Sequence, residues 1–399
     1  MRIGIVSEAL PYLPSSGGFR LYGANLIRCL SRNHEVELVS FLESDDSSHL
    51  DWARKYCVSV HVLEWPRQRR ILAPASLVSA HLFGRPLQGR RQLGNVLQKV
   101  SQNWEVLHVE GPYAAGLIPA RLEVPKLLSA HDSWTIRCAE LRRCAQSPSE
   151  RIYYTMLAYH EPRYERLVYP RFGRCVFVTE RDAAEVRRIA PGAKCVVVSN
   201  GVDTEYYQAC VSAEDTMTMV FHGHLGYGPN AEAALFFANE ILPLIRHELP
   251  QAAFRLVGAQ PGSAIRELAQ RPGISIAADL PDIRQALASA NVYVSPILHG
   301  SGIKNKVLEA MALSLPIVCF SPSVEGIPCV PDQHVLIARD PSEFAAKVVD
   351  LLRAPTRASE IGRAARRLVE EAFSWDSRAA AFERLYGDLR AEAPQERLR

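Results

Sequence analysis

The 399-residue chain lacks several features that would mark a special class of protein. It contains no run of about 18 apolar residues, so no membrane-spanning helix is expected. None of the nine cysteines belongs to a CxxC pair, and their odd number argues against a disulfide framework or a zinc site. Positive and negative charges nearly cancel, leaving a net charge of +3, so nothing in the composition calls for a nucleic acid partner.

The start of the chain also lacks the pattern of a secretory signal. The opening apolar run stops at Pro11 and is too short for that purpose, so it is interpreted as a buried strand. We therefore expect a cytoplasmic protein.

One stretch of the first half could bring the protein to the inner face of a membrane. Residues 66–100 carry six arginines and one lysine, no acidic residue, and interleaved apolar side chains. Such a segment can bind anionic lipid or a phosphorylated acceptor, which predicts peripheral membrane contact. The ordinary alternative is a solvated, arginine-rich surface.

Strand-like and helix-like segments alternate along the chain, which is typical of parallel α/β layers. Two series of such segments are separated by the polar, irregular residues 199–212. We predict an α/β fold with two Rossmann-like, doubly wound parallel-sheet domains that face a cleft, residues 1–200 and 201–373. The segment 374–390 has apolar residues at helical spacing and is predicted to form a further helix.

The loop after the first strand is one candidate ligand site. In open parallel sheets, ligands bind beyond the carboxyl ends of the strands, and phosphates favour helix N-termini. The paired glycines Gly17 and Gly18 would let backbone amides approach an anion or a sugar closely, although a plain turn would use the same pair. No GxGxxG motif follows a strand, so a dehydrogenase is not indicated.

A later loop is more informative because it leads into a helix that starts with lysines. The chain has only seven lysines, and Lys304 and Lys306 both stand at this glycine-flanked helix start. An ordinary first turn favours acidic residues, since cations oppose the helix dipole there. We expect the lysines and backbone amides to hold a diphosphate, while Glu309, one turn after Asn305, accepts hydrogen bonds from ribose hydroxyls. The donor-binding residues predicted in this loop are Ser301, Gly302, Ile303, Lys304 and Asn305.

Several motifs of the chain resemble those of a known family. Residues 300–309, Gly-Ser-Gly-Ile-Lys-Asn-Lys-Val-Leu-Glu, are similar to the donor-site signature of GT-B glycosyltransferases, specifically glycosyltransferase family 4. Residues 198–207, residues 222–225 with Pro229 and Asn230, Asp282 before an Ile-Arg pair, and residues 373–375 fit the same family pattern in the same order. The subgroup that the sequence resembles most is associated with exopolysaccharide and PEP-CTERM (EpsH-type) loci.

The resemblance implies a retaining, metal-independent hexosyltransferase without a tightly bound cofactor. A nucleotide-diphosphate sugar, UDP- or GDP-linked, would bind to the second domain as the donor. A glycan, a lipid-linked molecule or a small molecule would offer its hydroxyl from the first domain. The role would be exopolysaccharide or cell-envelope glycan synthesis, and the helix at 374–390 would cross back to the N-terminal domain.

The resemblance also implies roles for single residues. His131, just past the end of a strand, matches a histidine that contributes to the donor sugar and the reacting centre. Glu309 matches the second carboxylate of a Glu-x7-Glu pair, whose first member falls at Ser301 and is therefore missing.

Gly223 and His224 lie where the family holds the diphosphate, but the family's lysine there falls at Pro229. We therefore expect Lys304 and Lys306 to supply the positive charge. The predicted catalytic residues are His131, Lys306 and Glu309, which act by electrostatics and not as nucleophiles.

Two other readings of the sequence remain open. A nucleotide-sugar epimerase or a phosphorolytic enzyme could share the fold, and an epimerase would need no acceptor. A catalytically silent donor-binding scaffold subunit is the alternative from another class, and the missing carboxylate at Ser301 favours it.

Overall fold

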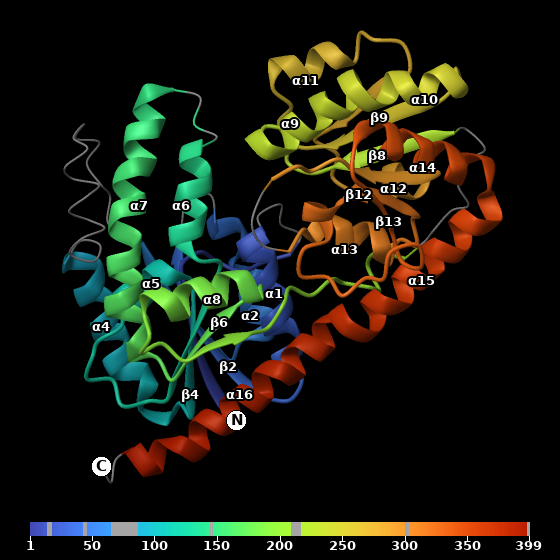
Figure 1. Ribbon diagram of the computed structural model, residues 1–399. Coiled ribbons are helices and arrows are strands. Elements are labelled where there is room, and N and C mark those ends of the chain that lie inside the picture. The colour runs from blue at the N-terminus through green and yellow to red at the C-terminus, as the bar shows by residue number, and fades with distance from the viewer. Residues whose placement is uncertain are drawn as a thin grey trace. The chain divides into compact units, whose positions relative to one another are not determined.

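The computed structural model describes residues 1–13, 18–42, 46–64, 87–143, 145, 147–208, 217–299 and 303–396. The chain divides into two compact units (Figure 1). Unit 1 comprises Met1–Ser199 together with Arg378–Arg399, and unit 2 comprises Asn200–Ser377. The division after Ser199 falls at the start of the polar segment 199–212.

Unit 1 is built on a seven-stranded sheet in the order β3-β2-β1-β4-β5-β6-β7. Every pair of neighbouring strands in it is parallel. The strands are β1 (Arg2–Ser7), β2 (Glu35–Leu42), β3 (Ser59–Glu64), β4 (Val106–Glu110), β5 (Lys126–His131), β6 (Arg174–Phe177) and β7 (Cys195–Val197). The central strands β1 and β4 are buried almost throughout, as expected for a parallel sheet covered on both faces.

Helices connect these strands. They are α1 (Gly18–Leu30), α2 (Leu50–Tyr56), α4 (Leu87–Val100), α5 (Pro112–Leu117), α6 (Trp134–Arg143), α7 (Pro148–Val168) and α8 (Glu180–Ile189). Short 3₁₀ turns lie at Asp46–His49, Ser101–Asn103 and Tyr169–Arg171. The long helix α7 begins with a capping box, in which Ser147 and Glu150 bond to each other's backbone amides.

Unit 2 repeats this architecture with six parallel strands in the order β10-β9-β8-β11-β12-β13. The strands are β8 (Thr218–His222), β9 (Ala253–Gly258), β10 (Ile274–Ala278), β11 (Val292–Ser295), β12 (Ile317–Phe320) and β13 (Leu336–Ala338). The helices are α9 (Gly228–Phe236), α10 (Leu242–Glu248), α11 (Ser263–Leu268), α12 (Arg284–Ala288), α13 (Asn305–Ala312), α14 (Pro341–Arg353) and α15 (Pro355–Phe373). A π-helical turn at Phe237–Ile241 joins α9 to α10, and a 3₁₀ turn lies at Ser321–Val324. The predicted class of two parallel-sheet α/β domains is thus confirmed.

Each sheet reverses its strand order at one point, between β1 and β4 in unit 1 and between β8 and β11 in unit 2. At such a switch point the connections leave in opposite directions and open a crevice beyond the carboxyl ends of the strands, where ligands bind. The topology therefore indicates one place to search in each unit.

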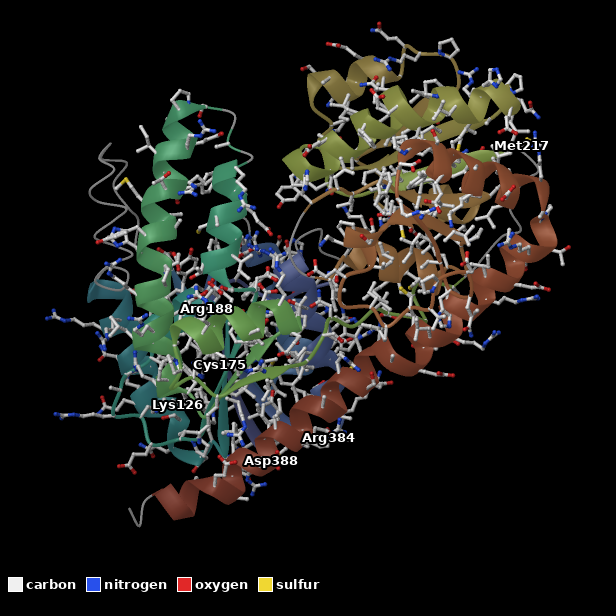
Figure 2. The ribbon with its side chains drawn as sticks, viewed as in Figure 1. Lys126, Cys175, Arg188, Met217, Arg384 and Asp388 are labelled. Carbon is white, nitrogen blue, oxygen red and sulfur yellow. The ribbon has the colours of Figure 1, made fainter. Side chains whose placement is uncertain are left out.

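The terminal helix α16 (Trp375–Glu396) starts in unit 2, and its residues from Arg378 onward belong to unit 1. Its apolar stripe is fully buried there: Phe382 and Tyr386 have no exposed surface and Leu389 has 4%. Arg384 and Asp388 lie on the exposed side of the same helix (Figure 2). The predicted return of the terminal helix to the first unit is confirmed.

No helix in the described part of the chain is long and apolar enough to cross a membrane. Of the predicted lipid-binding stretch 66–100, only residues 87–100, which form helix α4, belong to the described residues. Residues 66–86 lie outside them.

Candidate functional site

The switch point of unit 2 brings together a histidine and a carboxylate from distant segments. His222 is the last residue of β8 and is buried, and its Nε2 lies 2.7 Å from Oε2 of Glu309 on α13. Glu309 is partly exposed, with 16% of its side-chain surface accessible. It also accepts a hydrogen bond from Tyr207, whose hydroxyl pKa is raised first by burial and then by this carboxylate. Glu309 therefore stands at the carboxyl end of β8 with both a buried anchor and an accessible oxygen.

Lys306 lies on the same helix and reaches a second polar residue. Its ammonium donates a hydrogen bond to Oδ1 of Asn230 on α9 and lies 5.1 Å from the ring centre of Phe221. Burial lowers the pKa of Lys306 to about 8, although the charge of Glu309 opposes that shift, while Lys304 adds to it. A bound anion would stabilise the charge of this lysine, because it would replace the solvation that the ammonium has lost on burial.

Two glycines allow this close packing. Gly223 follows β8 with a φ of 150°, and a Cβ atom on it would lie 3.1 Å from the Lys306 ammonium and 3.0 Å from the amide nitrogen of Asn230. Gly258 ends β9 with a φ of 151°, and a Cβ atom there would lie 1.7 Å from the carbonyl oxygen of Gly223. The predicted residue Gly223 thus lies beside Lys306. A larger side chain would not fit between the two strand ends and the lysine.

The remaining predicted donor residues differ in their surroundings. Ile303 is buried, and Asn305 is fixed by its Oδ1 atom, which accepts a hydrogen bond of 2.7 Å from Asn200. Lys304 is the N-cap residue of α13, whose first turn has no acidic residue. His224 has an exposed side chain, and its backbone carbonyl accepts a hydrogen bond of 2.9 Å from Asn230. Gly17, Ser301 and Gly302 lie outside the described residues.

The switch point of unit 1 holds His131, the last residue of β5. Its φ is 64°, a conformation that is uncommon for a residue other than glycine. Its Nε2 lies 2.5 Å from Oε1 of Glu110, the last residue of β4. Tyr22 and Phe19, on the helix that Gly18 begins, place their rings edge-on to the imidazole, with centroids 4.5 and 5.4 Å away.

Glu110 is the electrostatic centre of this second cluster. Burial by itself raises the pKa of a carboxyl, but His131 and His108 hold the pKa of Glu110 down at about 2. Burial also tends to lower the pKa of His131, but Glu110 outweighs it, so the pKa of His131 is raised. Glu8, whose Oε1 accepts a 2.8 Å hydrogen bond from the first turn of α5 at Ala114, adds to this negative field.

Several of these polar residues had no role assigned from the sequence. Asn230 and Tyr207 lie within segments that resemble the family, whereas Glu110 and His108 belong to no motif. A further signal was position, since Glu110 ends a strand and Asn230 lies in the first turn of a helix after a strand. Within the described residues, no group of three or more His, Cys, Asp or Glu side chains could hold a metal ion.

Two family models match the chain, one in each half. Residues 16–206 match the model described as Glycosyltransferase Family 4, and residues 216–354 match the model described as Glycosyl transferases group 1. A curated relative, an uncharacterized 44.6 kDa protein in the cps region of Klebsiella pneumoniae, is 21% identical over 392 residues. The match covers 94% of this chain and 97% of that protein.

Solved structures share the fold. Sucrose-phosphate synthase from Thermosynechococcus elongatus matches with a TM-score of 0.73 at 14% identity, over 98% of this chain and 100% of the other. HepE of Anabaena in complex with UDP matches with a TM-score of 0.66 at 13% identity, over 97% of this chain and 100% of the other. At these identities the likeness concerns the arrangement of both units' strands and helices.

Proposed function

Because the chain carries a glycosyltransferase family 4 domain and a glycosyl transferases group 1 domain on a GT-B fold, it is a GT-B glycosyltransferase, and we propose that it is a retaining, metal-independent one. It moves a sugar from a nucleotide-diphosphate sugar, UDP- or GDP-linked, to a hydroxyl acceptor. Unit 2 binds the donor and unit 1 binds the acceptor.

The observation that carries this proposal is the pair of polar contacts on α13. Glu309, anchored by His222 at 2.7 Å, presents carboxylate oxygens that can accept hydrogen bonds from ribose hydroxyls. Three residues earlier, Lys306 holds a desolvated ammonium at the start of the same helix. A nucleoside diphosphate needs both functions side by side, one for its sugar and one for its phosphates.

The chemistry that these groups supply is electrostatic. As the glycosidic bond stretches, negative charge accumulates on the leaving phosphate and positive charge on the sugar ring. Lys306 and the first amides of α13 are fixed in place before the reaction, so they stabilise the phosphate charge without reorganising, and Lys304 adds its charge at the same helix start. The leaving phosphate can itself take the proton of the acceptor hydroxyl, so no side chain is required as a nucleophile.

His131 of unit 1 takes the role that the family resemblance implies, a contribution to the donor sugar and the reacting centre. Gly18 is the first residue of α1, and the pair Gly17 and Gly18 would let backbone amides approach an anion or a sugar closely. The acceptor is a glycan, a lipid-linked molecule or a small molecule. Synthesis of exopolysaccharide or a cell-envelope glycan is supported by the relative in a cps region, and the specific likeness to EpsH-type enzymes stays a prediction.

The donor is tested first by binding. HepE of Anabaena was crystallised with UDP and with UDP-glucose, so a thermal-shift panel should include UDP, UDP-glucose, GDP and GDP-mannose. We expect one base to raise the Tm, since a ligand at about 100 times its Kd stabilises a protein by about 2.7 kcal/mol. A panel without any shift would contradict donor binding.

Turnover is tested with a matched pair of lysine variants. Lys306→Ala should lower release of UDP or GDP from the donor at least about tenfold, because it removes the charge that stabilises the leaving phosphate. Lys347→Ala is the control, since Lys347 lies on α14 and pairs with Glu343 at 3.4 Å. Equal losses in both variants would remove Lys306 from the mechanism.

A catalytically silent scaffold subunit is the second candidate, because Ser301 stands where the family has a carboxylate. It would bind the donor in the same panel but release no sugar to water or to any acceptor. Mass spectrometry of the donor after incubation separates the two functions.

A further inference from the structure

Three buried side chains in unit 1 form a continuous hydrogen-bonded chain that leads from the terminal helix to the partly exposed His131. The Tyr386 hydroxyl on α16 lies 2.6 Å from Nδ1 of His108, and Nε2 of His108 lies 2.9 Å from Oε2 of Glu110. The other oxygen of Glu110 lies 2.5 Å from Nε2 of His131. Tyr386 and His108 have no exposed surface and Glu110 has 1%, so water does not compete for these bonds.

The direction of every hydrogen bond in this chain follows from one ionised group. An ionised carboxylate can only accept hydrogen bonds, so both histidines must donate to Glu110 from Nε2. When its ring is neutral, His108 then carries no proton on Nδ1, and this atom accepts a hydrogen bond from the hydroxyl of Tyr386. The same argument places the proton of a neutral His131 ring on Nε2.

One ring nitrogen of His131, Nδ1, is therefore not used in this hydrogen-bonded chain. Within the described residues, every hydrogen bond of the ring is made by Nε2. The rings of Tyr22 and Phe19 hold the imidazole from two sides, which prevents it from turning over. The Nδ1 atom is therefore left to meet a substrate.

We propose that Glu110 is a positioning residue of the transferase, itself held by His108 and Tyr386, which fixes the proton of His131 on Nε2 so that Nδ1 is the atom that faces the substrate. This inference rests on the proposed function, because the positioned histidine is taken to act in sugar transfer. The tautomer and the pKa of the His131 ring can nevertheless be measured without any donor. The terminal helix thereby supplies a residue that acts on the reaction from within unit 1.

A purely structural role would explain this chain poorly. Burying an ionised carboxylate is costly unless it is fully paired, and an apolar side chain of similar size would usually stabilise a core at least as well. Glu110 ends its strand at the switch point, and only one of its two partners, His131, is partly exposed. The arrangement stabilises a particular state of one accessible histidine.

Other ionisable groups also face the chain. Glu8, from the segment after β1, and Asp132, the residue that follows β5, both raise the pKa of His131 through their negative charge. Tyr22 on α1 faces Glu110, and Arg378 on α16 lies near Tyr22. A change in His131 must therefore be assigned to Glu110 by substitution and not by pH alone.

The test uses the full chain labelled with ¹⁵N-histidine. Nitrogen chemical shifts report the tautomer and the pKa of His131, which is assigned from a His131→Asn variant. We expect the neutral ring of the wild type to carry its proton on Nε2. In Glu110→Gln the pKa of His131 should fall by about 1 to 3, as expected for loss of an adjacent opposite charge, and Glu110→Asp should restore part of it. An unchanged His131 titration in Glu110→Gln would overturn the inference.

Tyr386→Phe is the milder variant, in case the carboxyl substitution impairs folding. It leaves Nδ1 of His108 without its donor, so we expect the Nδ1 chemical shift of His108 to change while its proton stays on Nε2, and a smaller shift at His131. The matched control is Tyr169→Phe, because Tyr169 is equally buried in unit 1 and its hydroxyl has no hydrogen-bond partner among the described residues. A Tyr169→Phe spectrum that changed as much as that of Tyr386→Phe would contradict the directed chain.

Turnover distinguishes this inference from the proposed function. With UDP-glucose or GDP-mannose, Glu110→Gln should lower kcat at least about tenfold with little change in KM, and the lower limb of the pH profile should move with the pKa of His131. A His131 titration that moves while kcat stays constant would overturn the positioning role. A wild-type enzyme that consumes no donor would contradict the proposed function, while the spectra still decide the state of His131.

Discussion

Nε2 of His222 lies 2.7 Å from Oε2 of Glu309, a contact that ties the end of β8 to the side of α13 across 87 residues of sequence. Because His222 is buried, the contact contributes to stability, and because Glu309 is partly exposed, its carboxylate can also reach a ligand. Substitutions of Glu309 can separate its effect on stability from its effect on ligand binding.

Glu309→Ala removes the partner of a buried N–H group, which should cost about 1 to 3 kcal/mol of unfolding free energy, and it also removes the predicted ribose contact. Glu309→Gln retains an oxygen that can accept the His222 hydrogen bond. We expect the alanine variant to lose both Tm and UDP-glucose affinity, and the glutamine variant to lose mainly affinity. Calorimetric unfolding and titration calorimetry measure the two effects.

Glu248→Gln is the control for Glu309, since Glu248 forms a surface ion pair with Arg353 at 2.9 Å. It should alter neither quantity measurably. A Glu309→Gln protein that binds UDP-glucose as well as the wild type would show that this carboxylate does not hold the donor.

The pKa of about 8 for Lys306 predicts a pH dependence of donor binding. The ammonium is present below that pH and is lost above it, so the affinity for UDP should fall between pH 8 and 9.5. Binding of an anion should raise the pKa of Lys306, so UDP binding near pH 8.5 should take up a proton. Titration calorimetry in buffers of different ionisation enthalpy detects that proton, and Lys306→Arg should bind without taking one up.

The same lysine should affect stability in the opposite direction. Its pKa is lower in the folded protein than in the unfolded chain, so the unfolded chain binds more protons between pH 8 and 10.5. The contribution of Lys306 to stability should therefore increase as pH rises through that window. Relative to Lys306→Met, the wild type should gain stability over this range in urea unfolding, by about 1 to 3 kcal/mol. A constant difference would indicate an ordinary, solvated lysine.

Gly223→Ala should damage the site through the backbone. Its φ of 150° is strained for any residue with a Cβ atom, and that atom would press on Lys306 and Asn230. We expect a loss of about 1 to 3 kcal/mol in stability together with weaker UDP binding. Gly387→Ala on α16 is the matched control, because no described atom lies within 4 Å of its added methyl group, and it should leave the Tm unchanged or slightly higher. Equal effects of the two substitutions would contradict the geometry.

Glu165 gives unit 1 a pH dependence of its own. Burial raises its pKa to about 7, although Thr135 and the amide of Trp134 donate hydrogen bonds of 2.7 and 2.9 Å to it. The folded state therefore binds more protons than the unfolded chain between about pH 4.5 and 7, so this residue lowers stability as pH rises through that range. Glu165→Gln should remove this part of the dependence, and its unfolding free energy should exceed that of the wild type at pH 8. If the unfolding free energies of the two proteins changed with pH in parallel, Glu165 would not be the source of this dependence.

Much of the fold could be predicted from the sequence because its signals are local. Buried strands such as β4 and β11 are short apolar runs, and the stripe of α16 repeats at helical spacing, so each is visible within about ten residues. The start of α13 was also visible, because two lysines at a helix N-terminus contradict the usual charge preference.

The polar partners could not be predicted in the same way. Tyr386 and His108 are 278 residues apart, and Lys306 and Asn230 are 76 apart. No periodicity links such residues, since their meeting depends on strand order and on where each helix returns to the sheet. His222 in particular could have been an ordinary core residue, and only its contact with Glu309 distinguishes it.

The discontinuity of unit 1 has a consequence for biosynthesis. The side chains of Phe382 and Tyr386, which complete its interior, follow the whole of unit 2 in the sequence. During translation, unit 2 emerges whole from the ribosome while the earlier half still lacks its final helix. The N-terminal half must therefore stay incompletely packed until that helix has been synthesised, and a nascent chain stalled near residue 377 would be a natural client for chaperones.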